Sequence, residues 1–103
     1  MTKKSDRYPL SDLKVLDFSR VLAGPFAGRM LSDLGADVIK IEPPEGDVTR
    51  FWGKEVANIP GYYHQQNIGK RNICLNLRKP DAVTLIKRLV ETTDIVIENY
   101  RPD

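Results

Sequence analysis

Lys14-Val-Leu-Asp-Phe-Ser19 opens the part of the sequence that decides the fold. This short apolar run is typical of a buried β-strand. From Pro25 to Leu34 apolar residues recur at helical spacing, and Gly35 suits the position just past a helix end. Asp37-Val-Ile-Lys-Ile-Glu42 then has the pattern of a second buried strand. The short joints between these three pieces predict two parallel strands linked by a right-handed helical crossover.

The second half of the chain has the same order of elements. Asn72-Ile-Cys-Leu-Asn76 alternates polar and apolar residues, as a strand does. Pro80 suits the first turn of a helix that runs to about Thr92, and Asp94-Ile-Val-Ile-Glu98 has the pattern of a final strand. We therefore predict an α/β fold, a Rossmann-like parallel sheet with flanking helices, formed by residues 1–103 as one domain.

A long connection, Pro43 to Gly69, joins the two halves and is rich in proline, glycine and aromatic residues. A connection of this length inside a compact domain is uncommon and is usually functional. Its aromatic side chains indicate packing against this chain or another one. Within it, Tyr62 to Asn67 is compatible with a helical turn.

The composition is that of one ordinary soluble domain, with 103 residues, 41% apolar and 29% charged. No apolar run approaches the roughly 18 residues of a membrane span and no signal-peptide pattern begins the chain, so we expect a cytoplasmic protein without membrane contacts. The single cysteine, Cys74, excludes an internal disulfide and a multi-cysteine zinc site, and we expect no metal. A net charge of +2 is too small to indicate a nucleic-acid partner.

The charge is unevenly distributed. Between Asn67 and Pro80 the chain carries several bases and no acid. Such a stretch on a nearly neutral domain suits a small polyanion such as a nucleotide, although a solvated loop has the same composition. We expect Lys70, Arg71 and Arg78 to bind phosphate.

The turn after the first predicted strand contains Gly24 and Gly28. This is not the dinucleotide-binding fingerprint, because Leu22 stands where a first glycine would be. Glu42 does end the second strand, roughly where such enzymes place an acid that binds ribose. Either the turn approaches a ligand closely, or the two glycines serve tight packing of the helix on the sheet.

Three blocks together resemble a known family: LKVLDFSRVLAGPFAGRMLSDLGADVIKIEPPEGD (13–47), GKRNICLNLRKPDA (69–82) and DIVIENYRPD (94–103). Over about residues 10–103 they closely resemble the N-terminal segment of family III CoA-transferases. That group includes formyl-CoA and carnitine CoA-transferases, and α-methylacyl-CoA racemases are close relatives. The resemblance implies the N-terminal, coenzyme A-binding part of a larger two-domain enzyme that forms an interlocked homodimer.

The resemblance also implies which residues contact CoA. Leu22 and Ala23 would lie beside the thioester arm. The adenine and phosphate end would be lined by Leu75, Asn76, Leu77 and Arg78, and the end of the last strand would meet CoA through Asn99, Tyr100 and Arg101. Some members have a CoA-contacting arginine just after the second strand, and here that position is Pro43.

The family's nucleophile is an aspartate that the resemblance places beyond Asp103, so we expect this chain alone to be inactive. In the transferases, CoA passes from an acyl-CoA thioester through an aspartyl intermediate to a small carboxylic acid. In the racemases, acid and base groups instead move the α-proton. The hypotheses are therefore a CoA-transferase, a racemase on the same fold, or a non-catalytic nucleotide-binding or interaction module; the acyl donor and acceptor stay open.

Three residues of this chain are conceivable as nucleophiles or bases, and a structural role is the better interpretation of each. Cys74 lies mid-strand without an activating base, so we expect a packed side chain. His64 lies in a polar run and is expected to face solvent or cap a helix. Asp17 lies inside the first strand and is expected to satisfy nearby backbone or turn groups.

Overall fold

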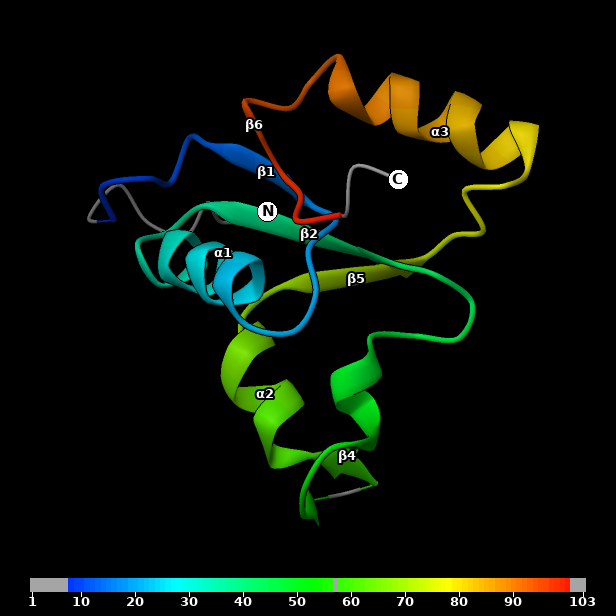
Figure 1. Cartoon of the computed structure of the whole chain (residues 1–103). Coiled ribbons are helices and arrows are strands. Elements are labelled where there is room, and N and C mark those ends of the chain that lie inside the picture. Colours follow the sequence, from blue (N-terminus) through cyan, green and yellow to red (C-terminus); the bar gives the residue numbers. More distant parts are fainter. Residues whose placement is uncertain (1–7, 57, 101–103) are drawn as a thin grey trace.

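The computed structural model describes residues 8–56 and 58–100, and these form a twisted parallel sheet with helices on both sides (Figure 1). The sheet confirms the predicted α/β fold. Its four strands, in the spatial order β5-β2-β1-β6, are β5 (Arg71–Cys74), β2 (Asp37–Glu42), β1 (Lys14–Asp17) and β6 (Ile95–Ile97). From β1 the chain adds β2 and then β5 on one side, and it adds β6 on the other side of β1. The strand order therefore reverses between β1 and β6.

Register divides the sheet into an apolar end and a charged end. Val15 of β1 pairs with Val38 of β2, and these two form the core together with Ala36. Two residues further on, Asp17 pairs with Lys40, and both are fully buried. Because alternate residues share a face of a strand, the face that is apolar at its amino end becomes ionic at its carboxyl end.

Helix α1 (Ala23–Asp33) packs on this face through its smallest side chains. Gly24, Gly28 and Ser32 are buried at four-residue spacing, and Pro25 is buried beside the first of them. Leu31 packs against the core, whereas Phe26 and Met30, together with the capping residues Leu22 and Leu34, are about half exposed. The sequence predicts the helix but not the face that packs on the sheet. That face carries the small side chains, because glycine and serine let the helix approach the strands closely.

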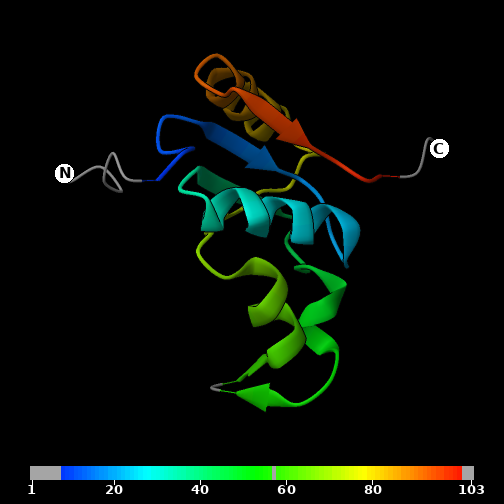
Figure 2. The same ribbon diagram turned by 90° about the vertical axis from the view of Figure 1, so that its left-hand side faces the viewer.

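The connection between β2 and β5, which we call the connecting segment (residues 43–69), has regular structure of its own. It contains a 3₁₀ turn η1 (Val48–Phe51), a short antiparallel pair β3 (Glu55–Val56) and β4 (Ile59–Pro60), and helix α2 (Gly61–Asn67). Figure 2 shows it extending from the sheet on the α1 side. The helical turn predicted at 62–67 is confirmed as α2.

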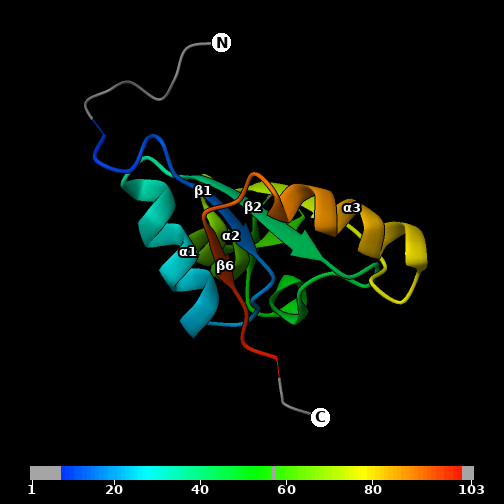
Figure 3. The ribbon, with the colours of Figure 1, turned by 90° about the horizontal axis from the view of Figure 1, so that it is seen from above.

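Helix α3 (Pro80–Val90) lies on the opposite side of the sheet. Seen from above, it lies beside β1 and β6 rather than over them (Figure 3), and Val96 of β6 is 49% exposed. Only Ala82 of α3 is buried, while Val83, Leu85 and Val90 are exposed. None of the helices in the described ranges has the length and apolar character that crossing a membrane requires.

Gly24→Ala tests whether this glycine is needed for packing. A Cβ there would overlap the buried side chain of Ser19, so we expect a loss of about 1–3 kcal/mol in the free energy of unfolding, measured by urea denaturation. Gly61→Ala is the control, because its Cβ would meet only the carbonyl oxygen of Lys54 at 3.7 Å. Equal midpoints for the two variants would contradict the packing role.

Candidate functional site

A cleft of about 530 Å³ lies at the carboxyl edge of the sheet. Residues that follow all four strands line it, and they come from β1 (Phe18, Ser19, Arg20), β2 (Pro43, Pro44, Glu45), β5 (Leu75, Asn76, Leu77, Arg78) and β6 (Tyr100). Side chains of the strand end and connecting segment complete the lining: Lys40, Ile41, Glu42 and Asp47. Ligands of open parallel sheets bind at this edge, where the strand order reverses.

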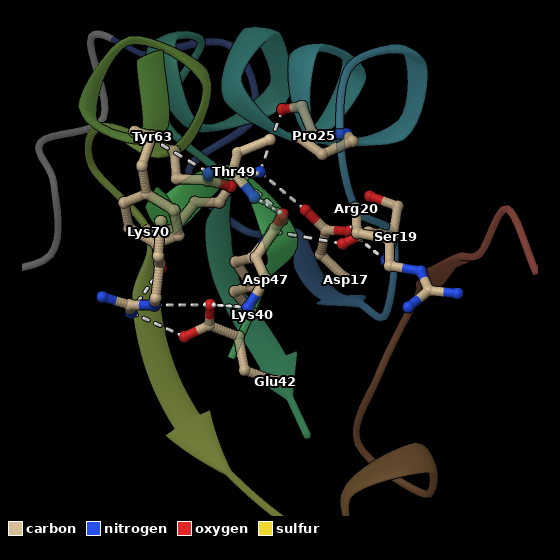
Figure 4. Close-up of polar contacts among 12 residues, drawn as sticks. Asp17, Ser19, Arg20, Pro25, Lys40, Glu42, Asp47, Thr49, Tyr63 and Lys70 are labelled. Carbon is tan, nitrogen blue, oxygen red and sulfur yellow. Dashed lines mark hydrogen bonds and ion pairs between the residues drawn. The ribbon is translucent and has the colours of Figure 1, made fainter. Parts of the chain in front are cut away.

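The floor of the cleft contains a buried ion pair (Figure 4). Lys40 Nζ lies 2.9 Å from Asp47 Oδ2 and also donates to the carbonyl oxygen of Ser19 at 3.1 Å. The other carboxylate oxygen of Asp47 accepts from the backbone N–H and the hydroxyl of Thr49. Burial opposes ionisation of Asp47, but these bonds and Lys40 outweigh it and lower its pKa. The lysine charge is therefore neutralised within the protein.

A second buried ion pair lies behind the β1–α1 turn. Lys70 Nζ contacts Asp17 Oδ2 at 2.7 Å, the carbonyl oxygen of Pro25 at 2.9 Å and Asn67 Oδ1 at 2.8 Å. The remaining oxygen of Asp17 accepts from the backbone N–H and the hydroxyl of Ser19. Burial lowers the pKa of Lys70. All three ammonium donors are thus used inside the protein.

Glu42 is the centre of a third polar cluster. Arg50 binds both of its carboxylate oxygens, at 2.9 and 2.7 Å, and Asn72 and the backbone N–H of Asp47 also donate to it. Burial alone would raise the pKa of Glu42, but these donors outweigh it and lower the pKa to about 2. Tyr63 lies against the Arg50 guanidinium, and its hydroxyl accepts from Arg50 at 2.8 Å.

The turn that follows β1 is held by the end of β6. The Asn99 side chain accepts from the N–H of Arg20 at 3.1 Å and donates to the carbonyl oxygen of the same residue at 2.8 Å. The next residue, Val21, has φ +76°, which is rare for a β-branched residue and is typical of a functionally constrained turn. The Arg20 guanidinium extends over the Tyr100 ring, 6.0 Å from its centroid.

The comparisons with known proteins agree with one another. The model of CoA-transferase family III matches residues 10–103. A succinate–glutarate CoA-transferase from Agrobacterium fabrum (strain C58 / ATCC 33970) is 52% identical, over 92% of this chain and 26% of the relative, and the succinyl-CoA:glutarate CoA-transferase of Homo sapiens is 48% identical, over 91% and 22%. A crystal structure of a CAIB/BAIF family protein from Brucella suis superposes with a TM-score of 0.84 at 48% identity, over 89% of this chain and 26% of that one.

This chain belongs to CoA-transferase family III. The resemblance stated from the sequence blocks is therefore confirmed. The chain spans about a quarter of the length of these relatives.

The cleft brings together most, but not all, of the residues expected from the family resemblance. Leu75, Asn76, Leu77, Arg78 and Tyr100 line it. Leu22 and Ala23 are exposed on the β1–α1 turn and Asn99 binds the Arg20 backbone, and these three are not among the lining residues. Arg101 lies outside the described residues.

The basic stretch is divided by the structure. Arg78 follows the carboxyl end of β5, but Lys70 and Arg71 lie at its amino end, where Lys70 pairs with Asp17 and Arg71 with Asp37. The Lys70 ammonium is buried against Asp17 and has all of its donors engaged, so the prediction that it binds phosphate is wrong. Arg71 is exposed, pairs with Asp37 and does not line the cleft, and its phosphate contact stays a prediction.

The other polar residues singled out from the sequence have structural roles or none in the cleft. Asp17 satisfies turn groups and Lys70, as expected. Glu42 is occupied by Arg50 and Asn72, so it is not free to bind ribose. His64 is exposed, as expected, whereas Cys74 is exposed instead of packed.

Sequence reasoning missed Arg20 and Glu45 as lining residues. Both directly follow strands that were predicted, so the rule that ligands bind at carboxyl strand ends was sufficient to find them.

Glu42→Gln tests the electrostatic role of the carboxylate. Its folded pKa of about 2 lies below the ordinary 4.5, so its contribution to stability is complete above pH 4.5 and is lost as the pH falls towards 2. We expect the variant to be less stable than the parent at pH 7 by on the order of 3 kcal/mol, with the difference shrinking as the pH approaches 2. Urea denaturation at pH 7, 4 and 2.5 measures this.

Glu45→Gln is the matched control, because Glu45 is exposed and has no ion pair among residues 8–56 and 58–100. Its effect on stability should stay small at every pH. A stability difference for Glu42→Gln that does not change with pH would show that the glutamate acts through shape alone.

Proposed function

We propose that this chain is the N-terminal, coenzyme A-binding part of an enzyme that moves CoA between an acyl-CoA thioester and a carboxylic acid. The observation that carries the proposal is the cleft at the reversal of strand order, in a chain of CoA-transferase family III. Arg78 is exposed at the β5 end of this cleft and suits a phosphate of CoA. Leu75 and Leu77 supply apolar surface for the adenine.

The chemistry that follows by family resemblance is covalent catalysis by an aspartate outside these residues. Its carboxylate attacks the thioester carbonyl and the C–S bond breaks. The CoA thiolate departs, and the aspartate and the acyl group are joined as a mixed anhydride. The thiolate then attacks the aspartyl carbonyl and releases the first acid, which gives an aspartyl-CoA thioester. The acceptor carboxylate attacks this thioester and expels the thiolate, which attacks the acceptor carbonyl of the new anhydride, so that the new acyl-CoA forms and the aspartate is freed. The names of the relatives support transfer over racemisation.

Exposed apolar surface supports a larger assembly. Phe26 and Met30 on α1 are about half exposed, and so is Val96 of β6, which pairs with Leu16 on the face of the sheet away from α1. Burial of such side chains contributes about 1.5–3 kcal/mol each. We infer that a second domain and the partner chain of an interlocked homodimer cover these faces.

A chimera tests the proposal. Residues 10–103 replace the matching segment of the Agrobacterium fabrum succinate–glutarate CoA-transferase, and transfer from succinyl-CoA to glutarate is followed by mass spectrometry. We expect activity within about ten-fold of that relative, because this segment supplies the CoA site and the remainder supplies the nucleophile. A folded chimera that binds CoA without turnover would favour the non-catalytic module instead.

The 103-residue chain alone should show no acyl transfer above a no-protein control in the same assay. Asp17, the carboxylate at the end of β1, has both oxygens engaged by Lys70 and Ser19. Transfer by the isolated chain that is abolished by Asp17→Asn would show that the nucleophile has been misplaced.

Arg78→Ala should raise the dissociation constant of CoA for the chimera about ten-fold, measured by calorimetry, because one charge-assisted phosphate contact is lost. Lys79→Ala is the control: it removes a neighbouring exposed charge that does not line the cleft, so its effect should be less than two-fold. Equal effects of the two substitutions would indicate only general attraction of the polyanion.

A further inference from the structure

Two arginines of the cleft have no carboxylate partner. Among the salt bridges of residues 8–56 and 58–100, none involves Arg20 or Arg78, and both side chains are exposed. The third cation of the lining, Lys40, is already neutralised by Asp47. The cleft therefore offers two separate positions for an anion.

These two positions lie towards opposite edges of the sheet. Arg78 follows β5, the first strand in the spatial order, and Arg20 follows β1 and is hydrogen-bonded through its backbone to Asn99 at the end of β6. Two strand spacings of about 4.8 Å separate β5 from β1, which is about 10 Å. One phosphate group is too small to reach both arginines, so the cleft suits a ligand with anionic groups at two places.

The middle of the cleft is unsuited to an anion. Pro43 and Pro44 follow the central strand β2 and offer no backbone N–H, and the exposed carboxylate of Glu45 lies beside them. A neutral, flexible linker fits here. The pantetheine arm of CoA is such a linker.

We propose that Arg20 binds a terminal carboxylate on the acyl group of the CoA thioester, so that the acyl group is that of a dicarboxylic acid. This rests on the proposed function, in which Arg78 binds the phosphate end. The Tyr100 ring faces the Arg20 guanidinium at 6.0 Å and leaves the N–H edges free for a bidentate carboxylate. Both relatives described above are named for dicarboxylates.

The test uses the 103-residue chain and a matched pair of stable thioethers, S-(3-carboxypropyl)-CoA and S-butyl-CoA. They differ only in a carboxylate in place of a methyl group at the end of the chain. Dissociation constants for both, and for CoA itself, are measured by ¹⁵N-resolved NMR titration of the parent, Arg20→Gln, Arg20→Lys and Arg78→Gln. Circular dichroism establishes that each variant folds.

We expect the parent to prefer the carboxylate ligand about three- to ten-fold. Arg20→Gln should abolish the preference while CoA binds within two-fold of the parent, and Arg20→Lys should retain part of it. Arg78→Gln should weaken all three ligands equally and leave the preference intact.

Two results would overturn the assignment and leave the proposed function standing. In the first, Arg20→Gln weakens the binding of all three ligands equally, which makes Arg20 a phosphate contact. In the second, Arg20→Gln keeps the preference for the carboxylate ligand. Absence of CoA binding by the folded parent would instead contradict the proposed function itself, and with it this assignment.

Discussion

Two buried ion pairs lie at the carboxyl end of the sheet: Lys40–Asp47 joins β2 to the connecting segment, and Lys70–Asp17 joins the residue before β5 to β1. Each takes two charges out of water, which costs about as much free energy as their attraction returns, so they specify geometry more than they add stability. Removing one partner leaves an uncompensated buried charge. The shape of the cleft therefore depends on four side chains, of which two line it and none is free to react with a ligand.

The same ion pairs explain why several charged side chains at the carboxyl edge of the sheet are not free to react. Asp47 comes from the segment after β2, and Lys70 from the residue just before β5. Each is hydrogen-bonded to the turn after β1, Asp47 through Lys40 and Lys70 through Asp17. Groups at the mouth of the cleft are thus positioned by side chains whose charges are already paired within the protein.

The strands and the long connection were predictable because each strand carries an apolar run bounded by proline, glycine or polar residues. The pairing of charges was not. The predicted strand at 72–76 already separated Lys70 and Arg71, which precede it, from Arg78, which follows it. Nothing in the sequence indicated that the Lys70 ammonium would be buried against Asp17 or that Arg71 would pair with Asp37. Likewise the apolar spacing of α1 predicted a helix, but not that Gly28 would face the sheet and Phe26 the outside.

Trp52, the single tryptophan, lies at the end of η1 with its ring centroid 5.8 Å from that of Tyr62. The only indole emission of the chain therefore originates in the connecting segment, away from the four-stranded sheet. Fluorescence reports on detachment of this segment, whereas far-ultraviolet circular dichroism reports on the sheet and helices. A difference between the fluorescence and circular dichroism unfolding curves would show that the connecting segment unfolds separately from the sheet.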